Sequence, residues 1–299
     1  MGALVLRNLD RMLWQLPPLP QAASRQLELH AAGERNPDAY ARVFRQDPGL
    51  SAAVVRLANC PAVGPGHPVH SIREACFSLG PDSLLSLVVS CAVLRQFPVI
   101  GGQPPGFDRH AFWVHGAAVA VLARAIAGRA GAPPDSSFAA GLLHDVGRAV
   151  LEAHFPREFG AVLRYRDRHD VWIRDAELAV IGFDHCVIGE RVARRWQLPE
   201  TVLGAIAQHH QPERPGHEEP AALIVHVADI LARGLEVGNP GDDTIPLLWE
   251  DALRRLGINW VDLRRCLRSA EELRETAGEV VERILPASSL SRTTDSLPL

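Results

Sequence analysis

The chain has 299 residues, of which 47% are hydrophobic and 22% are charged, and its formal net charge is −4. These values are typical of a globular protein that is long enough to bury a large core. The acidic balance disfavours a large phosphate-binding surface, so direct nucleic-acid binding is the least favoured class of function.

The cysteines and the N-terminal segment indicate a reduced compartment. None of the cysteines forms a CxxC pair, and four lie in apolar runs typical of a protein core: the full set is Cys60, Cys76, Cys91, Cys186 and Cys266. The first residues, MGALVLRNLDRMLWQ, lack a signal-peptide cleavage pattern, and no apolar run reaches the roughly 18 residues of a membrane span. We therefore expect a cytoplasmic protein that does not enter a membrane.

Helix signals dominate the first third of the chain. Asp47 and Pro48 supply an N-cap and a first-turn proline for a helix in GLSAAVVRLANC. Ser71 and Glu74 fit a capping box before IREACFSLG, and the apolar run SLLSLVVSCAVLRQF is expected to be buried. These signals predict an N-terminal helical lobe over residues 1–97.

The Gly/Pro-rich segment PVIGGQPPGF predicts a linker over 98–107. Beyond it, DRHAFWVHGAAVAVLARAIAGRAG predicts one long helix, and FAAGLLHDVGRAVLE (138–152) predicts a buried one. Further helices are expected in DAELAVIG, HCVIGERVARRWQ, PETVLGAIAQHH and PAALIVHVADILARG, then a loop over 234–246 and two last helices. Together they predict a second lobe over 108–285, followed by a disordered tail over 286–299. With no run of alternating strands, the predicted fold class is all-α, with two helical lobes packed together.

Several of these apolar helices carry histidines or aspartates. Burying an unpartnered imidazole or carboxylate costs several kcal/mol, yet FAAGLLHDVGRAVLE places two such residues side by side. Imidazoles and carboxylates are ligands for divalent transition metals, and coordination would satisfy both. Helices packed as a bundle would bring inward-facing ligands to one site. The metal pocket predicted from this pattern consists of His115, His144, Asp145, His209, His210 and Asp229, and His185 opens a neighbouring helix that should face the same interior.

Other histidines have simpler interpretations. A lone buried histidine is usually hydrogen-bonded within a core, and we expect this for His154 and His226. His110, His169 and His217 are expected on the surface or in loops.

The sequence resembles the HDOD family, a relative of the HD-type metal-dependent phosphohydrolases, over roughly residues 13–285. In the N-terminal half the resemblance lies in LPPLP, DPGLSAAVVRLANC, HSIREACFSLG and LLSLVV. In the C-terminal half it lies in FWVHG, FAAGLLHDVGRAVL, GFDHCVIGERVARRWQLPE and HHQPE. Many matched segments in the same order make this resemblance specific, which a single His-Asp pair would not be.

The resemblance implies a role for each residue of the pocket. His115 matches the first histidine of the HD superfamily, the pair at 144–145 matches the HD motif, and Asp229 matches the final aspartate. The HD-GYP branch, which cleaves cyclic dinucleotides, has additional histidines that His185, His209 and His210 resemble.

Three departures from the HD-GYP pattern disfavour catalysis. HD-GYP enzymes carry a Glu one turn before the first His, where this chain has Ala111, and a Lys after the HD motif, where it has Arg148. The segment QPERPGHEEP contains nothing like GYP. Losing a bridging carboxylate weakens a two-metal site, and arginine cannot act as a general acid near neutral pH. If the chain is an enzyme, Asp145 and Arg148 are the catalytic candidates, with Arg148 holding a substrate phosphate.

The HDOD family is associated with bacterial signal transduction, often without demonstrated hydrolysis. The favoured interpretation is therefore a regulatory module that binds signalling proteins or a small ligand, such as a nucleotide or cyclic dinucleotide. The alternative is a metal-dependent phosphohydrolase acting on those same ligands. We expect one or two divalent ions of iron, manganese, magnesium, nickel or zinc, or no metal in a purely regulatory module.

Overall fold

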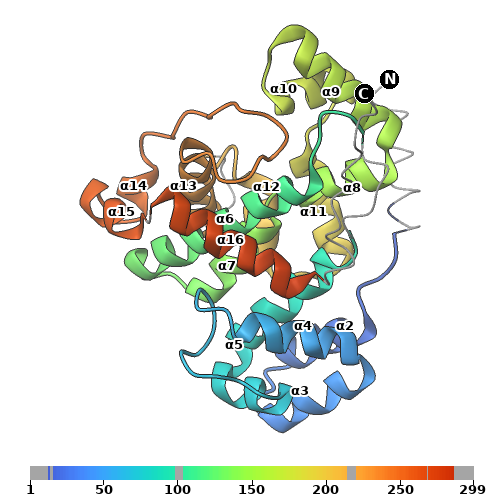
Figure 1. Ribbon diagram of the computed structural model, residues 1–299, viewed down its shortest axis with the longest axis vertical. Coiled ribbons are helices and arrows are strands. Elements are labelled where there is room, and N and C mark those ends of the chain that lie inside the picture. The colour runs from blue at the N-terminus through green and yellow to red at the C-terminus, as the bar shows by residue number, and fades with distance from the viewer. Residues whose placement is uncertain (1–12, 14–15, 98–103, 214–219, 268, 286–299) are drawn as a thin grey trace, which may run out of the picture.

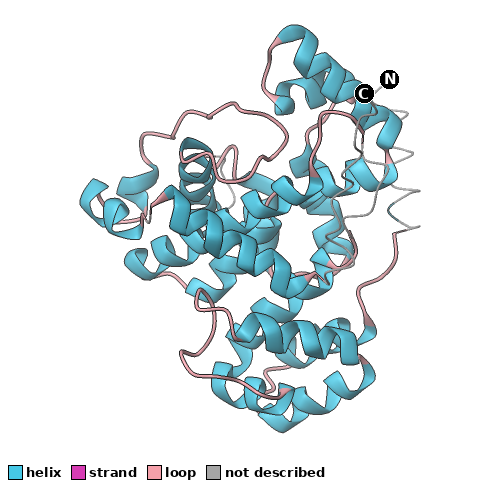
Figure 2. Cartoon of the chain, viewed as in Figure 1, coloured by secondary structure: helices cyan, strands magenta, loops and turns pink. Residues whose placement is uncertain are grey.

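The computed structural model describes residues 13, 16–97, 104–213, 220–267 and 269–285. Within these ranges the regular secondary structure is helical, with no strand (Figure 2). The predicted all-α class is therefore confirmed. Most of the predicted linker, at 98–103, and the predicted tail lie outside the described residues.

The N-terminal lobe is a small group of helices, seen at the bottom of Figure 1. Asp47 caps its third helix as predicted, since its side chain accepts a hydrogen bond from the backbone N–H of Leu50 at 2.8 Å. The longest helix is kinked where Gly80 adopts φ +73° and Pro81 follows. The helices are α2 (Gln21–Ala31), α3 (Pro37–Val43), α4 (Pro48–Ala58) and α5 (Ile72–Leu94), with a 3₁₀ turn at Phe44–Gln46.

The second lobe holds the remaining helices and lies above the first in Figure 1. Its first helix is long and mostly buried, and the others pack around it. The helices are α6 (Arg109–Ala130), α7 (Pro134–Leu143), α8 (Val146–His154), α9 (Pro156–His169), α10 (Ile173–Val180), α11 (His185–Arg195), α12 (Glu200–Gln208), α13 (Pro220–Gly234), α14 (Ala252–Arg255), α15 (Trp260–Cys266) and α16 (Ala270–Ile284).

Two helix contacts join the lobes. Helix α5 packs against α7, and the C-terminal helix α16 packs against both α6 and α4. Arg56 and Arg283 exchange side-chain hydrogen bonds with each other's backbone carbonyl, at 2.9 and 3.0 Å. The last helix of the chain thus contacts the lobe formed by its beginning (Figure 1).

The helix expected over 138–152 is interrupted, so that prediction is wrong in its centre. Helix α7 ends before His144 and α8 begins after Asp145, which has φ −97° and ψ +14°. Gly147, in the first turn of α8, lies against α11 so closely that a Cβ there would be 2.0 Å from the His185 carbonyl oxygen. The break therefore redirects the chain and lets α8 pack directly on α11.

Other predicted elements need smaller corrections. Pro156 stands just past the end of α8 at His154 and begins α9, a helix that was not predicted from the sequence. Its buried face consists of Phe159, Gly160, Val162 and Leu163. Near the C-terminus, three helices stand where two were expected.

The expectation that no segment could span a membrane also needs correction. By length and composition alone, α5 and α6 are apolar enough to do so. In the structure, however, 61% and 78% of their most apolar windows are buried among the other helices. Burial of this kind is typical of core helices, which pass the same test.

Candidate metal centre

The structure brings the seven predicted residues together in one buried pocket of the second lobe. His115 lies in α6, His185 begins α11, and Asp229 lies in α13. The other four lie in turns, at 144–145 after α7 and at 209–210 after α12. Six of the seven are at most 3% exposed, and His210 is half-buried.

One part of the pocket consists of His115, His144 and Asp229, here called the Asp229 cluster. Nε2 of His115 lies 2.9 Å from Oδ1 of Asp229. Nε2 of His144 lies 3.9 Å from the same oxygen and 3.4 Å from Oδ2 of Asp145. Two helices and a turn, far apart in the sequence, thus present two imidazoles to a carboxylate.

Both carboxylates of the pocket are paired with buried arginines. Arg233 Nε donates to Asp229 Oδ1 at 2.9 Å, and Arg148 Nη1 donates to Asp145 Oδ2 at 2.5 Å. Burial alone would raise the pKa of each carboxyl, but the neighbouring guanidinium and imidazole groups hold both pKa values well below the usual range. Both side chains are therefore ionised and already face a fixed positive charge.

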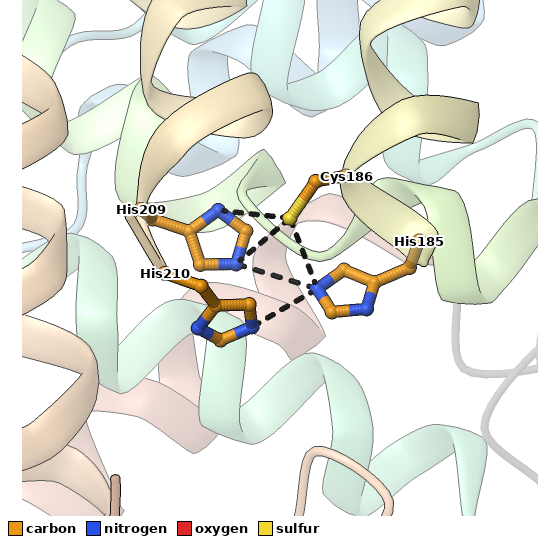
Figure 3. A group of neighbouring side chains, drawn as sticks. All are labelled: His185, Cys186, His209 and His210. Carbon is orange, nitrogen blue, oxygen red and sulfur yellow. Dashed lines mark hydrogen bonds between the residues drawn. The ribbon is translucent and has the colours of Figure 1, made fainter. Parts of the chain in front are cut away.

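The other part of the pocket consists of His185, Cys186, His209 and His210, here called the Cys186 cluster (Figure 3). Nε2 of His185 lies 3.4 Å from Nε2 of His209 and 3.1 Å from Nε2 of His210. The Cys186 Sγ lies 3.6 Å from Nε2 of His185 and 3.9 Å from Nε2 of His209. Asp145 contacts both clusters. Its Oδ2 lies 3.4 Å from Nε2 of His144 in the Asp229 cluster, and its Oδ1 lies 3.0 Å from Nε2 of His185 and 3.4 Å from Nε2 of His209.

Hydrogen bonds outside the pocket fix the orientation of three rings. Nδ1 of His185 donates to Glu177 Oε2 at 2.6 Å, because a carboxylate can only accept. Backbone carbonyls accept from Nδ1 of His144 at 2.7 Å and from Nδ1 of His209 at 3.0 Å. When neutral, each ring therefore turns the lone pair of Nε2 into the pocket, as metal-binding histidines do.

Unpartnered atoms show that the donor set fits a cation. Nε2 of His144 and Oδ1 of Asp145 are buried and have no hydrogen-bond partner in the described part of the chain. Facing lone pairs repel unless a proton or a metal ion lies between them. Burial alone would lower the pKa of His209, but Cys186 and Asp145 raise it to about 10, so a metal ion bound at its Nε2 would replace a proton. The residues present therefore fit a divalent transition metal, held by imidazoles together with Asp145.

A loop over 238–244 covers the Asp229 cluster. Gly238, at φ +71°, lies so close to α6 that a Cβ would be 2.2 Å from the backbone nitrogen of His115. The next residue, Asn239, donates its backbone N–H to the Ala111 carbonyl at 3.0 Å. Loop backbone thus lies against Ala111, where an HD-GYP enzyme would carry a glutamate.

The described cavities lie elsewhere. Three surface cavities, of about 610, 780 and 440 Å³, are lined by other described residues and by none of the seven. The second includes Ala111 and Asp242 but does not reach the histidines. The described cavities therefore give no route from solvent to the pocket.

Four residues that shape the pocket were not predicted from the sequence. Arg233 stands four residues after Asp229, so helical spacing could have revealed it. Cys186 directly follows His185, so its position next to a predicted ligand could have indicated it. Glu177 and Asp242 reach the site only through packing, and no local signal marks them: both are buried and bind the arginines.

Some of the expectations for the other histidines are confirmed, and one is wrong. His226 is hydrogen-bonded in the core as expected, since Nδ1 donates to the His209 carbonyl at 2.7 Å and Nε2 accepts from Trp249 N–H at 3.1 Å. His154 is exposed, so its expected core position is wrong, and His169 is exposed as expected. Residue 217 lies outside the described ranges.

The structure is thus an all-helical fold around a buried pocket of histidines and aspartates. The family model for the HDOD domain matches residues 16–212, which is more than half of the chain. The chain therefore belongs to the HDOD domain family, and the resemblance noted in the sequence is confirmed.

Known proteins similar to this chain share most of its fold. An HDOD domain protein of unknown function from Geobacter sulfurreducens is 29% identical with a TM-score of 0.70, over 92% of this chain and 97% of that one. A candidate phosphohydrolase from Shewanella amazonensis is 24% identical with a TM-score of 0.70, over 97% and 99%, which shows a shared fold. An uncharacterised protein of Treponema pallidum is 26% identical over 235 residues, covering 76% of this chain but only 44% of that protein. The chain thus spans less than half the length of that relative.

Proposed function

We propose that this chain is a regulatory HDOD module in signal transduction, which binds a metal ion in its HD-type pocket without hydrolysing a substrate. The observation that carries the proposal is the pairing of Arg233 with Asp229 and of Arg148 with Asp145. Two-metal hydrolysis needs carboxylates whose negative charge is available to hold both ions. In this pocket each carboxylate is already neutralised by a buried guanidinium.

The covering of the pocket supports the same proposal. Arg148, the residue expected to hold a substrate phosphate, is 0% exposed and contacts Glu177 as well as Asp145. Its Nη1 also donates to the Pro240 carbonyl in the covering loop at 3.2 Å. A phosphate would have to displace both the loop and these contacts before reaching the guanidinium.

A regulatory module of this kind would act through its surface. In line with the family, its partners would be signalling proteins, or a nucleotide or cyclic dinucleotide that binds without being cleaved. The lobe contact through α16 supports this role, because a ligand on one lobe could alter the packing of the other.

Turnover assays test the proposal directly. Purified protein loaded with Mn²⁺ or Fe²⁺ is offered nucleoside mono-, di- and triphosphates and cyclic dinucleotides, and we expect no phosphate or linear product above the protein-free rate. The matched control is His144→Ala, which removes an unpartnered ring nitrogen from the pocket. Turnover that the intact protein shows and this variant lacks would overturn the regulatory proposal.

The second candidate is a metal-dependent phosphohydrolase acting on a nucleotide or cyclic dinucleotide. One observation favours it: Nη2 of Arg148 and Nη2 of Arg233 are buried and have no partner in the described part of the chain. Such N–H groups suit phosphate oxygens, which accept charge-assisted hydrogen bonds. A bound divalent ion would supply water of lowered pKa. The same assay separates the two candidates.

A further inference from the structure

We propose that Cys186 is the fourth protein ligand of a zinc-type site formed with His185, His209 and His210. Four protein ligands close the coordination shell of Zn²⁺, whereas catalytic zinc sites keep a position open for water. This proposal rests on the proposed regulatory function, because a zinc site with a closed coordination shell contributes to structure or regulation rather than to hydrolysis. We infer the role of Cys186 as a ligand from the geometry of the Cys186 cluster, and not from the ligands that the HD resemblance implies.

The spacing of the donor atoms carries the inference. Tetrahedral Zn²⁺ with bonds of about 2.0–2.1 Å to nitrogen and about 2.3 Å to sulfur separates two nitrogens by about 3.3 Å and nitrogen from sulfur by about 3.6 Å. The observed Nε2 separations from His185 are 3.4 Å to His209 and 3.1 Å to His210. The Cys186 Sγ lies 3.6 and 3.9 Å from two of these nitrogens. All four donor atoms lie within 4.8 Å of one another, so small side-chain movements would bring them to the separations that one ion requires.

The orientation of the rings supports the same site. The Nδ1 atoms of His185 and His209 already donate to oxygen acceptors, so once a metal ion displaces the Nε2 protons, the Nε2 lone pairs face the ion and the sulfur. A buried cysteine is more commonly a small apolar core residue. That interpretation does not explain why the sulfur contacts imidazole nitrogens, which are polar and lie inside the pocket (Figure 3).

Asp145 is the competing ligand for the same ion. Its Oδ1 lies 3.0 Å from Nε2 of His185, but its Oδ2 is engaged by Arg148, which withdraws negative charge from the carboxylate. The neighbours of the Cys186 sulfur are the imidazoles of His185 and His209, which can give up a proton to a metal ion as a guanidinium cannot, and sulfur is a softer ligand than oxygen. Sulfur with imidazole nitrogen selects Zn²⁺ and related transition ions over Mg²⁺ and Ca²⁺, which prefer oxygen.

Cobalt substitution tests the ligand directly. Full-length protein is stripped of metal, titrated with Co²⁺ and followed by absorption, because a Co²⁺–thiolate bond gives a near-ultraviolet charge-transfer band. We expect this band in the intact protein at one ion per chain, and we expect Cys186→Ser to lose it while binding Co²⁺ at least about tenfold more weakly. The matched control is Cys91→Ser, since Cys91 is equally buried but lies in α5 of the other lobe; it should keep the band.

X-ray absorption of the zinc-loaded intact protein gives a second measurement that needs no variant. One sulfur at about 2.3 Å from zinc supports the proposal. Zinc bound through nitrogen and oxygen alone, no zinc binding, or a cobalt band that survives Cys186→Ser would each overturn it. Failure here leaves the regulatory proposal standing, whereas nucleotide turnover with a cobalt–thiolate band would overturn the regulatory proposal and leave Cys186 as a ligand.

Discussion

The Asp229 cluster and the Cys186 cluster lie side by side in one pocket, and Asp145 contacts both. They differ in how their buried polar groups are stabilised. In the Asp229 cluster, Arg233 neutralises the carboxylate, so the protein supplies its own cation. In the Cys186 cluster, imidazole nitrogens and a sulfur face one another. The carboxylate of the first cluster is therefore paired within the fold, although Nε2 of His144 has no partner in the described part of the chain, whereas the facing donor atoms of the second cluster need a proton or a metal ion between them.

This difference suggests an order of metal binding. An ion entering the Asp229 cluster must compete with a fixed guanidinium, whereas an ion entering the Cys186 cluster replaces protons. We therefore expect the Cys186 cluster to bind metal first and the Asp229 cluster to contribute mainly to stability. The following changes test the two halves of that comparison.

The largest effect is expected from breaking the ion pair of the Asp229 cluster. Asp229→Ala leaves Arg233 buried with one of its two carboxylate partners missing, and we expect the free energy of unfolding to fall by about 3–5 kcal/mol. Denaturant unfolding in the presence of a chelator measures it. Glu190→Ala, which removes an exposed ion pair with Arg194, is the control and should cost only about 0.3–0.5 kcal/mol. Equal effects would show that the buried pair does not hold this cluster together.

The Cys186 cluster should respond to a change outside it. Glu177→Gln replaces the acceptor that orients His185 by one that also presents N–H groups, and we expect the affinity for Zn²⁺ to fall about 10–100-fold. Competition with a coloured chelator measures this affinity. Asp175→Asn, on the exposed side of the same helix, should leave it unchanged. Unaltered affinity in Glu177→Gln would contradict the assigned orientation of the His185 ring.

The covering loop should be sensitive at one glycine. Gly238→Ala requires a Cβ at φ +71° and against α6, so we expect a loss of about 1–3 kcal/mol in the free energy of unfolding. Gly278→Ala, in the open interior of α16, should instead stabilise by about 0.5–1 kcal/mol. Zinc affinity of the Cys186 cluster should stay the same in both variants. A neutral Gly238→Ala would mean that the loop does not pack tightly over the Asp229 cluster.

The smallest expected effect is a pH dependence of stability caused by His226. This residue lies beside the pocket and makes its hydrogen bonds as a neutral imidazole. Burial is the main cause that lowers the pKa of His226, and Nε2 must stay unprotonated to accept from Trp249. Its contribution to stability is complete above about pH 6.5 and decreases as the pH falls, because the unfolded chain then binds the extra proton. Relative to His226→Gln, the intact protein should lose at most about 1.4 kcal/mol per pH unit below that point. His169→Gln, an exposed change, should follow the intact protein.

Much of the fold could be read from local patterns. The N-cap at Asp47, the long helix after residue 108 and the apolar helices of the second lobe depend on neighbours within a few positions, and the structure has them where predicted. The break at His144 and Asp145 was missed, because apolar spacing continues through it. Only the close packing of Gly147 on α11 shows why the chain bends there.

The sequence by itself determined the family, the helical class and the seven residues that meet in the pocket, because residue type and helical spacing are local properties that the amino-acid order records. Tertiary structure decided how those residues are used. It set Arg148 and Arg233 on the two carboxylates, placed Glu177 behind His185, and covered the pocket with the loop at 238–244. These contacts join residues that are far apart in the chain, and their strength comes from burial, which removes water and makes each charge depend on its nearest partner.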